Sequence, residues 1–239
     1  MPRDHETYNR AKRNEQRTCS LPSCAKRRSF TSQWCSHHSK RAAKYGHPLA
    51  AFIQKSDLKP YRSRARKLLK RYASHPATVT ALEIIESCLR PGPAIKPNRT
   101  DDRYYLYREL TDVASADPPV TPREAMEVVL AVVMMAYYEP RRFPAGDGEP
   151  LNCAMANALF RIRRRPITES YYDDATGTVE NIGRPVSGRA CSAFGRRVRE
   201  SIGHYLLNIR VLLEEEERQR QEQARTLAMP LTASPSLSA

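Results

Sequence analysis

The sequence predicts a mostly α-helical protein, in which a small zinc-stabilised N-terminal module precedes a helical domain with one β-hairpin. Three cysteines and two histidines crowd into residues 19–38, as in metal-binding modules. Beyond residue 60, apolar residues recur at helical intervals over several long segments. The excess positive charge lies almost entirely in the first 75 residues, so we expect the functional contacts there.

The charge divides the chain into a basic head and a neutral body. The whole chain of 239 residues has 40 Lys/Arg and 26 Asp/Glu. Residues 1–75 hold 19 Lys/Arg and 4 Asp/Glu, a net charge of +15, which leaves 21 of the 40 basic and 22 of the 26 acidic groups, a net of −1, for the remainder. A basic head suits a polyanion such as nucleic acid. The alternative is a solvated, solubilising arm.

The apolar content of 40% is sufficient for a packed core but does not indicate a membrane protein. The longest apolar stretch, residues 125–138, is shorter than the roughly 20 residues that span a bilayer and contains Glu127. The N-terminus is polar and lacks the apolar core of a secretory signal. We therefore expect a cytoplasmic protein without a membrane partner. Three further cysteines, Cys88, Cys153 and Cys191, lie in apolar helical patterns and are expected to be buried hydrophobes.

Four residues have the types and spacing of a structural zinc site: Cys19, Cys24, Cys35 and His38. Pro22 and Ser23 favour a turn that brings the first two thiols together, and the C-x2-H pair lies about one helical turn apart. His37 is the alternative fourth ligand. Zn²⁺ is the expected ion, because it prefers four Cys or His ligands in a tetrahedron.

The run from Cys19 to Pro48 resembles the short Cys3His zinc-binding module of phage and bacterial HNH-type homing endonucleases. In that module two cysteines, a short hairpin and a C-x2-H pair precede a basic helix that ends at a glycine and a proline; here the helix is residues 39–45, followed by Gly46. The resemblance implies the same four ligands, and it implies that Arg41 and Lys44 lie on an exposed helical face. It covers about 30 residues.

The sequence departs from that family after residue 48. An HNH nuclease needs further histidine and Asn or Asp residues in a ββα-metal core. Only His75 and His204 remain, at a helix boundary and inside an amphipathic helix. The nuclease core is therefore absent, and no catalytic residue is predicted.

The chain is expected to divide into five segments. A basic helix over residues 60–73 carries an apolar stripe at Ala65, Leu68, Leu69 and Tyr72. A capping box at Thr121 and Glu124 opens a helix that is apolar nearly all round and is therefore central. The predicted segments are a zinc-binding module at 1–50, basic and amphipathic helices at 51–90, a Pro-rich linker at 91–100, a helical domain at 101–225 with a hairpin near 167–182, and a disordered tail at 226–239.

The first functional hypothesis is a nucleic-acid-binding protein, with DNA as the expected partner, from a phage or mobile element. The helical body would then bind a protein partner or self-associate. The alternatives are a divergent metal-dependent nuclease and a protein–protein adaptor with a structural zinc. The four arginines between residues 161 and 165 are a further candidate anion contact, with helix capping as the other interpretation. The predicted nucleic-acid contacts are Lys26, Arg27, Arg28, Arg41, Lys44, Arg62, Arg66, Lys67, Lys70 and Arg71.

Overall fold

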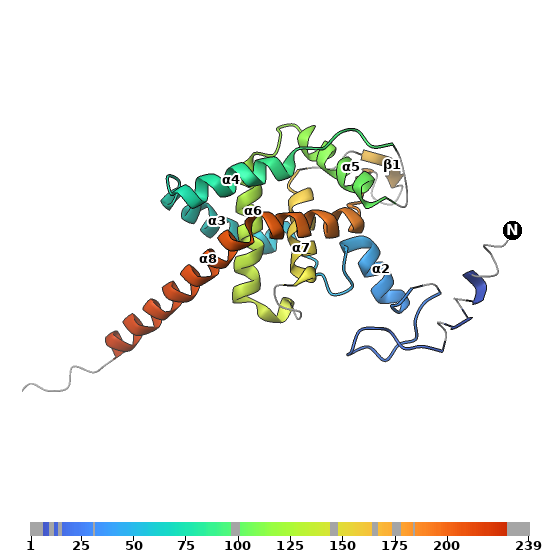
Figure 1. Ribbon diagram of the computed structural model, residues 1–239, viewed down its shortest axis with the longest axis horizontal. Helices are drawn as coiled ribbons and strands as arrows, with labels where there is room; N and C mark the ends of the chain where they lie inside the picture. The colour runs from blue at the N-terminus through green and yellow to red at the C-terminus, as the bar shows by residue number, and fades with distance from the viewer. Residues whose placement is uncertain are drawn as a thin grey trace, which may run out of the picture.

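The protein is mostly helical, as the sequence predicts, with a Cys–His cluster near the N-terminus (Figure 1). The computed structural model describes residues 7–9, 12–13, 16–30, 32–96, 101–143, 148–163, 167–173, 178–183 and 185–228. The helices are α2 (Ser36–Tyr45), α3 (Lys55–Arg71), α4 (Pro76–Leu89), α5 (Asp102–Ala114), α6 (Pro122–Tyr138), the 3-10 turn η1 (Pro140–Arg142), α7 (Glu149–Phe160) and α8 (Gly188–Ala228).

Local capping sets where the helices begin. The capping box predicted at the start of α6 is present: the Glu124 amide donates to the Thr121 hydroxyl at 3.2 Å, and the Glu124 carboxylate accepts from the Thr121 amide at 3.2 Å. Helix α3 begins five residues earlier than predicted. The Asp57 carboxylate accepts from the Gln54 amide at 3.2 Å and fixes that start, so Pro60 lies inside the helix.

Helix α6 is the centre of the body, as its all-round apolar sequence predicts. Its residues from Ala125 to Val132 are all buried. Helices α3, α4, α7 and α8 all pack against it. One hydrophobic cluster runs from Ala50 to Leu213 and joins α3 and α4 to the helices after them. The prolines at residues 91–93 thus connect two parts of a single packed core.

Two strands follow α7 in the sequence segment that we expect to hold a hairpin. Strand β1 (Ile167–Asp173) pairs antiparallel with β2 (Thr178–Gly183), with Tyr172 opposite Val179. The predicted turn between them, including Asp174, lies outside the described residues.

Helix α8 is the longest element, and glycines let it approach its neighbours closely. A Cβ atom on Gly195 would overlap the Asn152 carbonyl of α7, and one on Gly188 would overlap the Ala43 carbonyl of α2. Gly46 ends α2 in the left-handed conformation, at φ 87°, against the Gly188 carbonyl. These contacts fix α2 and α7 against the first half of α8.

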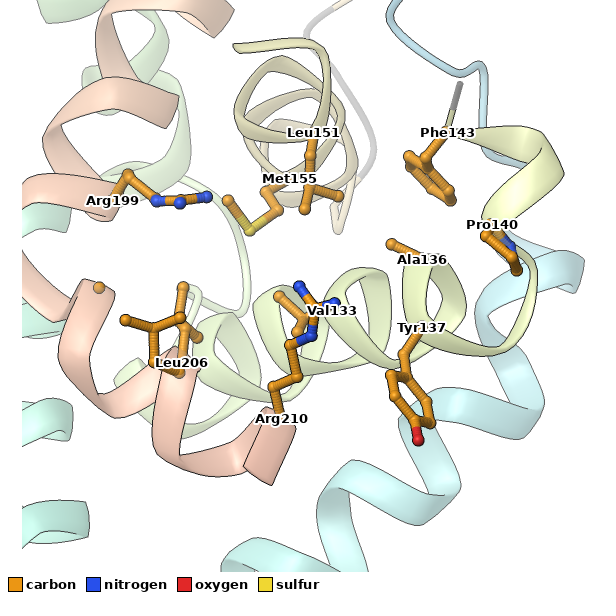
Figure 2. A pocket seen from close by; sticks show the side chains of 12 residues that line it. Val133, Ala136, Tyr137, Pro140, Phe143, Leu151, Met155, Arg199, Leu206 and Arg210 are labelled. Atoms are coloured by element: carbon orange, nitrogen blue, oxygen red, sulfur yellow. The ribbon is translucent and has the colours of Figure 1, made fainter. Parts of the chain in front are cut away.

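The second half of α8 projects from the body (Figure 1). The helix bends at Ile202, where φ is −123° and ψ is 17°, and a cavity lies between this bend, α6 and α7 (Figure 2). Leu213 is the last buried residue of α8 up to Arg225, and charged side chains dominate between these two residues. The helix continues to Ala228, three residues into the predicted tail, and residues 229–239 lie outside the described part. Among the described residues, no helix has the length and apolar content needed to cross a membrane.

Two glycines in α8 give a matched test of this packing. We expect Gly195→Ala to destabilise the protein by about 1–3 kcal/mol, because the added methyl group would push α7 and α8 apart. Gly203 has nothing within 4 Å of its would-be Cβ. Gly203→Ala should therefore raise stability by about 0.5–1 kcal/mol through helix propensity alone. Urea unfolding of both variants measures the difference, and equal effects at the two positions would contradict the close crossing at Gly195.

Candidate metal centre

A short hairpin carries the first two cysteines. The Cys19 amide donates to the Lys26 carbonyl at 2.8 Å, and the Arg28 amide donates to the Arg17 carbonyl at 2.9 Å. Within the hairpin, the Cys24 amide donates to the Leu21 carbonyl at 3.0 Å and closes the turn over residues 21–24. This is the turn that Pro22 and Ser23 favour. It places the two thiols on the same side of the backbone.

The second pair of candidate ligands comes from the start of α2. The Ser20 amide donates to the Gln33 carbonyl at 3.0 Å, which returns the chain to the hairpin. Cys35 is the residue before the first turn of α2, with extended φ and ψ, and the Ser39 amide donates to its carbonyl at 2.8 Å. His38 follows one turn into the helix. A rigid helix start therefore holds Cys35 and His38 against Cys19.

The four side chains meet in one cluster. Their ligand atoms all lie within 4.8 Å of one another. The Sγ atoms of Cys24 and Cys35 are 3.9 Å apart, and His38 Nδ1 lies 3.3 Å from Cys35 Sγ and 3.5 Å from Cys19 Sγ. Tetrahedral zinc, with bonds of about 2.3 Å to sulfur and 2.0–2.1 Å to nitrogen, separates its ligands by about 3.6–3.8 Å. The cluster therefore has the size of a tetrahedral metal site.

The surroundings of His38 favour its neutral form, which is the form that binds a metal. Burial, together with the positive charges of His37, Arg41 and Lys26, lowers the pKa of His38. The neutral imidazole that a metal requires is therefore favoured at neutral pH. His37 is exposed, stands outside the cluster, and meets His38 only through a T-shaped ring contact at 5.2 Å between centroids. Of the two candidates for the fourth ligand, His38 is the one in the cluster.

The thiols have unequal tendencies to ionise. Burial alone would raise the pKa of Cys19, but hydrogen bonds from the backbone at Leu21 and Cys35 and from neighbouring thiols outweigh burial and lower it. A backbone hydrogen bond at Lys26 favours the Cys24 thiolate, yet burial and the adjacent Cys35 and Cys19 raise its pKa overall. A bound cation deprotonates coordinating thiols, so a metal ion in this cluster would stabilise the thiolate form of its cysteines. Within the described residues it is the one group of His, Cys, Asp or Glu close enough to hold a metal.

Two of the predicted nucleic-acid contacts in the module, Arg28 and Arg41, form hydrogen bonds within the protein. Arg28 donates from Nε to the Thr18 carbonyl at 2.9 Å and from Nη2 to the Ser20 hydroxyl at 2.9 Å, so it holds the hairpin closed. Arg41, which the resemblance places on an exposed face, is half-buried. It donates to the carbonyls of Pro48 at 2.9 Å and Ala50 at 2.7 Å. Its guanidinium thereby satisfies the backbone that leaves α2.

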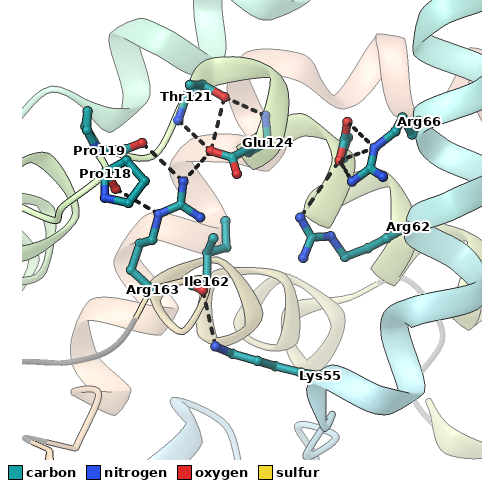
Figure 3. A network of polar contacts seen from close by, with 10 residues as sticks. Lys55, Arg62, Arg66, Pro118, Pro119, Thr121, Glu124, Ile162 and Arg163 are labelled. Atoms are coloured by element: carbon teal, nitrogen blue, oxygen red, sulfur yellow. Dashed lines mark hydrogen bonds and ion pairs between the residues drawn. The ribbon is translucent and has the colours of Figure 1, made fainter.

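Two predicted contacts on α3, Arg62 and Arg66, lie near one carboxylate of α6, although the Arg66 side chain is also 62% exposed (Figure 3). Arg66 forms an ion pair at 3.1 Å with Glu127 of α6, and Arg62 approaches the same carboxylate at 3.8 Å. The Glu127 side chain is only 5% exposed. A buried carboxylate requires a cation, so both arginines point toward α6. The sequence signal for this pairing is Glu127 itself, the one charged residue within the apolar stretch 125–138.

The arginines between residues 161 and 165, the further candidate anion contact, also make contacts within the protein where the structure describes them. Arg163 donates to the carbonyls of Pro118 at 2.8 Å and Pro119 at 3.3 Å, and to the Glu124 carboxylate at 2.6 Å. It therefore ties the end of α7 to the start of α6 (Figure 3). The guanidinium of Arg161 lies over the Phe52 ring, 5.0 Å from its centroid. Arg164 and Arg165 lie outside the described residues.

The remaining predicted contacts are exposed on two separate surfaces, one on the hairpin and α2 and the other on α3. We call Lys26, Arg27 and Lys44 the module surface, and Lys67, Lys70 and Arg71 the α3 surface; all six side chains are exposed. Helix α2 packs on α7 and α8, whereas α3 packs on α6. The two basic surfaces are therefore held by different parts of the fold.

Comparisons of the chain with protein-family models, with curated proteins and with solved structures found no match.

Removing the metal should unfold the module but leave the helical body intact, because the cluster lies outside the hydrophobic core from Ala50 to Leu213. The single tryptophan, Trp34, lies next to Cys35 in the module, so its fluorescence should change when the module unfolds. We expect a strong chelator to change Trp34 fluorescence while most of the far-UV helical signal remains. Loss of the helical signal in parallel with the fluorescence change would contradict this separation.

Two adjacent histidines give the control for the ligand set. We expect His38→Ala to weaken zinc affinity by more than the roughly 10–100-fold cost of altering a residue that only orients a ligand. His37→Ala should leave the affinity unchanged. Metal content by mass spectrometry and a competitive chelator titration measure both, and a loss in the His37 variant would reverse the assignment.

Proposed function

We propose that the protein binds nucleic acid, with DNA as the expected partner, through a basic N-terminal head that a structural zinc ion holds together. The observation that carries this proposal is the charge distribution: residues 1–75 have a net charge of +15, and the other residues together have −1. A polyanion attracts such a head over long distances and releases counterions when it binds. The resemblance to the zinc modules of HNH-type homing endonucleases supports a phage or mobile-element origin.

The ligand set supports zinc and a structural role for it. Three sulfur atoms and one imidazole nitrogen suit a borderline-soft ion such as Zn²⁺. A catalytic zinc keeps one position open for water or substrate, whereas four protein ligands close the tetrahedron. The zinc would therefore contribute folding free energy to a polar segment that has little apolar area to bury.

The exposed cations support a phosphate-binding role for both surfaces. The module surface surrounds a metal-held turn and therefore presents its charges from a fixed backbone. The α3 surface lies at the end of a helix whose opposite side, at Leu68 and Leu69, is anchored in the core. Neither set has an ion-pair partner among the described residues. Lysine and arginine in such positions bind phosphates without reading the sequence.

An exposed aromatic side chain in the module supports contact with bases as well. Phe30 is 63% exposed and has a φ of 34°. The turn around it is fixed by the Ser29 amide, which donates to the Trp34 carbonyl at 2.9 Å, and by the Ser32 amide, which donates to the Ser29 carbonyl at 2.8 Å. A positive φ strains a bulky residue, and such strain concentrates at functional positions. A presented aromatic ring beside lysine and arginine is suited to stacking on an unpaired base.

Neutralising the α3 surface tests the electrostatic part of the proposal. We expect replacement of Lys67, Lys70 and Arg71 by Gln to lower the affinity for duplex DNA. The slope of log K against log salt should become shallower by about 2–3, because each lost phosphate contact contributes about 0.9 to that slope. Thermal stability should change little, because all three side chains are exposed. The matched control replaces Arg218, Arg220 and Arg225 on the projecting half of α8 and removes the same charge elsewhere. An equal loss of DNA affinity in both variants would show that the net charge of the protein, and not the location of these cations on α3, determines the affinity.

The arginines that bind Glu127 should behave in the opposite way. We expect Arg62→Ala with Arg66→Ala to destabilise the protein by about 1–3 kcal/mol, because the Glu127 carboxylate would be left buried without its partners. DNA affinity of the folded protein should stay close to that of the wild type. Urea unfolding and a salt-dependent binding titration together separate the two outcomes, and unchanged stability would contradict the buried ion pair.

Phe30 gives a test of base stacking. We expect Phe30→Leu to weaken binding to a single-stranded oligonucleotide about ten-fold, since one base–aromatic stack would be lost. Tyr8→Leu is the control, because Tyr8 is equally exposed, at 62%, but lies outside the turn between Ser29 and Trp34. If the Phe30 variant binds with wild-type affinity, base stacking by Phe30 is excluded. The proposed phosphate contacts would not be affected by that result.

A further inference from the structure

A second cavity, of about 340 Å³, lies where α3 meets α4 beside the middle of α8. The chain turns between α3 and α4 at Tyr72 and His75, where the His75 amide donates to the Tyr72 carbonyl at 3.0 Å. Both of these residues line the cavity, and α4 and the stretch of α8 between Tyr205 and Leu212 supply the rest of its wall. The volume is at the lower end of the roughly 300–1,000 Å³ of ligand sites, so it suits a ligand of one or two rings.

The wall of this cavity is aromatic and apolar, with a few uncharged polar groups. Three of its residues have ring side chains: Tyr72, His75 and Tyr205. The rings of Tyr72 and His75 are in T-shaped contact, with 6.4 Å between their centroids. Among the described residues that line the cavity, none is Asp, Glu, Lys or Arg. An uncharged aromatic ring is therefore the kind of ligand that fits, because it stacks on aromatic side chains and has no charge to desolvate.

The polar groups of the wall offer both donors and acceptors to such a ring. His75 Nδ1 accepts from the Ala77 amide at 3.2 Å, so the neutral imidazole has its proton on Nε2, which can donate. Asn208 is exposed, and its side-chain amide can both donate and accept. The hydroxyls of Thr78 and Tyr205 lie 3.4 Å apart in the same wall. Nucleobases, whose ring edges have donors and acceptors side by side, match this set of groups.

The basic end of α3 lies next to the cavity. Lys70 and Arg71 are the last two residues of α3, they directly precede Tyr72, and both are exposed. The Arg71 guanidinium lies 5.6 Å from the centroid of the Tyr72 ring, which lines the cavity. A phosphate attached to a ligand in the cavity would therefore find a cation within reach. An uncharged aromatic wall with cations at its edge suits a nucleotide within a nucleic-acid strand.

We propose that this cavity holds an unpaired base of the bound nucleic acid. The base would stack on Tyr72 and form hydrogen bonds with Asn208 and His75, while Lys70 and Arg71 bind the phosphates beside it. Proteins that hold a single extruded base combine stacking with hydrogen bonds to the edge of the base in this way. The inference rests on the nucleic-acid binding proposed above, and it adds a preference for DNA that contains an unpaired base.

Fluorescence anisotropy of the full-length protein with zinc bound tests the preference, with three kinds of labelled DNA duplex. One duplex is fully paired, one has a single bulged base (each of the four bases in turn), and one has an abasic residue at the bulge. We expect at least one bulged base to bind about ten-fold more tightly than the abasic bulge, since the base adds one stack on an aromatic ring. Equal affinity with and without the base would overturn this inference, although binding of the paired duplex would still support the proposed function. Failure of all the duplexes to bind would overturn both.

Variants locate the base in this cavity. Tyr72→Leu should remove the preference for the bulged base over the abasic bulge, whereas Tyr72→Phe keeps the ring and should keep the preference. Ala77→Leu fills the cavity from an exposed position, so the preference should be lost while thermal stability stays unchanged. Ala224→Leu is the matched control, because Ala224 is also exposed on a helix but lies outside the cavity. A preference that survives both Tyr72→Leu and Ala77→Leu would overturn the assignment.

Two further measurements separate the cavity from other sources of the same chemistry. Phe30→Leu changes the module and should leave the preference for the bulged base intact. Loss of the preference in that variant alone would place the base at the module and overturn the inference. A free mononucleotide should displace the bulged duplex only at a concentration about 100-fold higher or more, because it lacks the additional phosphate contacts. Displacement at equal concentration would assign the cavity to free nucleotides and would also overturn the inference.

Discussion

The close approach of backbones at Gly188 and Gly195 is the constraint on which much of the arrangement depends. Helix α8 contacts α2 at the first glycine and α7 at the second, where no larger residue fits. Close approach increases the dispersion contacts between helices, and it also fixes their angle and register. With the first half of α8 held in this way, its apolar side from Ala190 to Leu213 completes the core around α6. The cavity of Figure 2 lies farther along α8, beside Gly203, where a Cβ atom would meet nothing within 4 Å.

A second constraint decides which positive charges are available to a partner. Carbonyl and carboxylate groups that lose water on folding require donors, and arginine supplies several from one side chain. Arg28, Arg41 and Arg163 therefore hold backbone carbonyls, while Arg62 and Arg66 bind Glu127. Lysines, whose single strongly hydrated charge is costly to bury, mostly remain exposed. The basic head thus contains arginines that bind groups within the fold and a second set of cations that lie exposed on its surface.

Sequence patterns predicted the features that depend on local order. The spacing of Cys19, Cys24, Cys35 and His38 predicted the cluster, because a turn and a helix start suffice to bring them together. The all-round apolar sequence of α6 predicted its central place, and the Thr121–Glu124 box predicted its first residue. The pairing of Arg66 with Glu127 joins residues 61 positions apart, and only the packing of α3 on α6 brings them together. The Gly203 cavity depends on a bend for which helical periodicity contains no signal.

The contact between Gly46 and Gly188 determines how the metal centre is coupled to the body. The Cys–His cluster lies at the start of α2, at Cys35 and His38, whereas the left-handed Gly46 fixes the end of α2 against α8. Loss of the metal would therefore release the hairpin and the first turn of α2 but leave its last turn anchored. An isolated helix of 10 residues is marginal in water, so α2 needs both ends held to stay ordered. A bound metal would thus position Lys26 and Arg27 relative to Lys44, and we expect the module surface to form one surface only while the metal is bound.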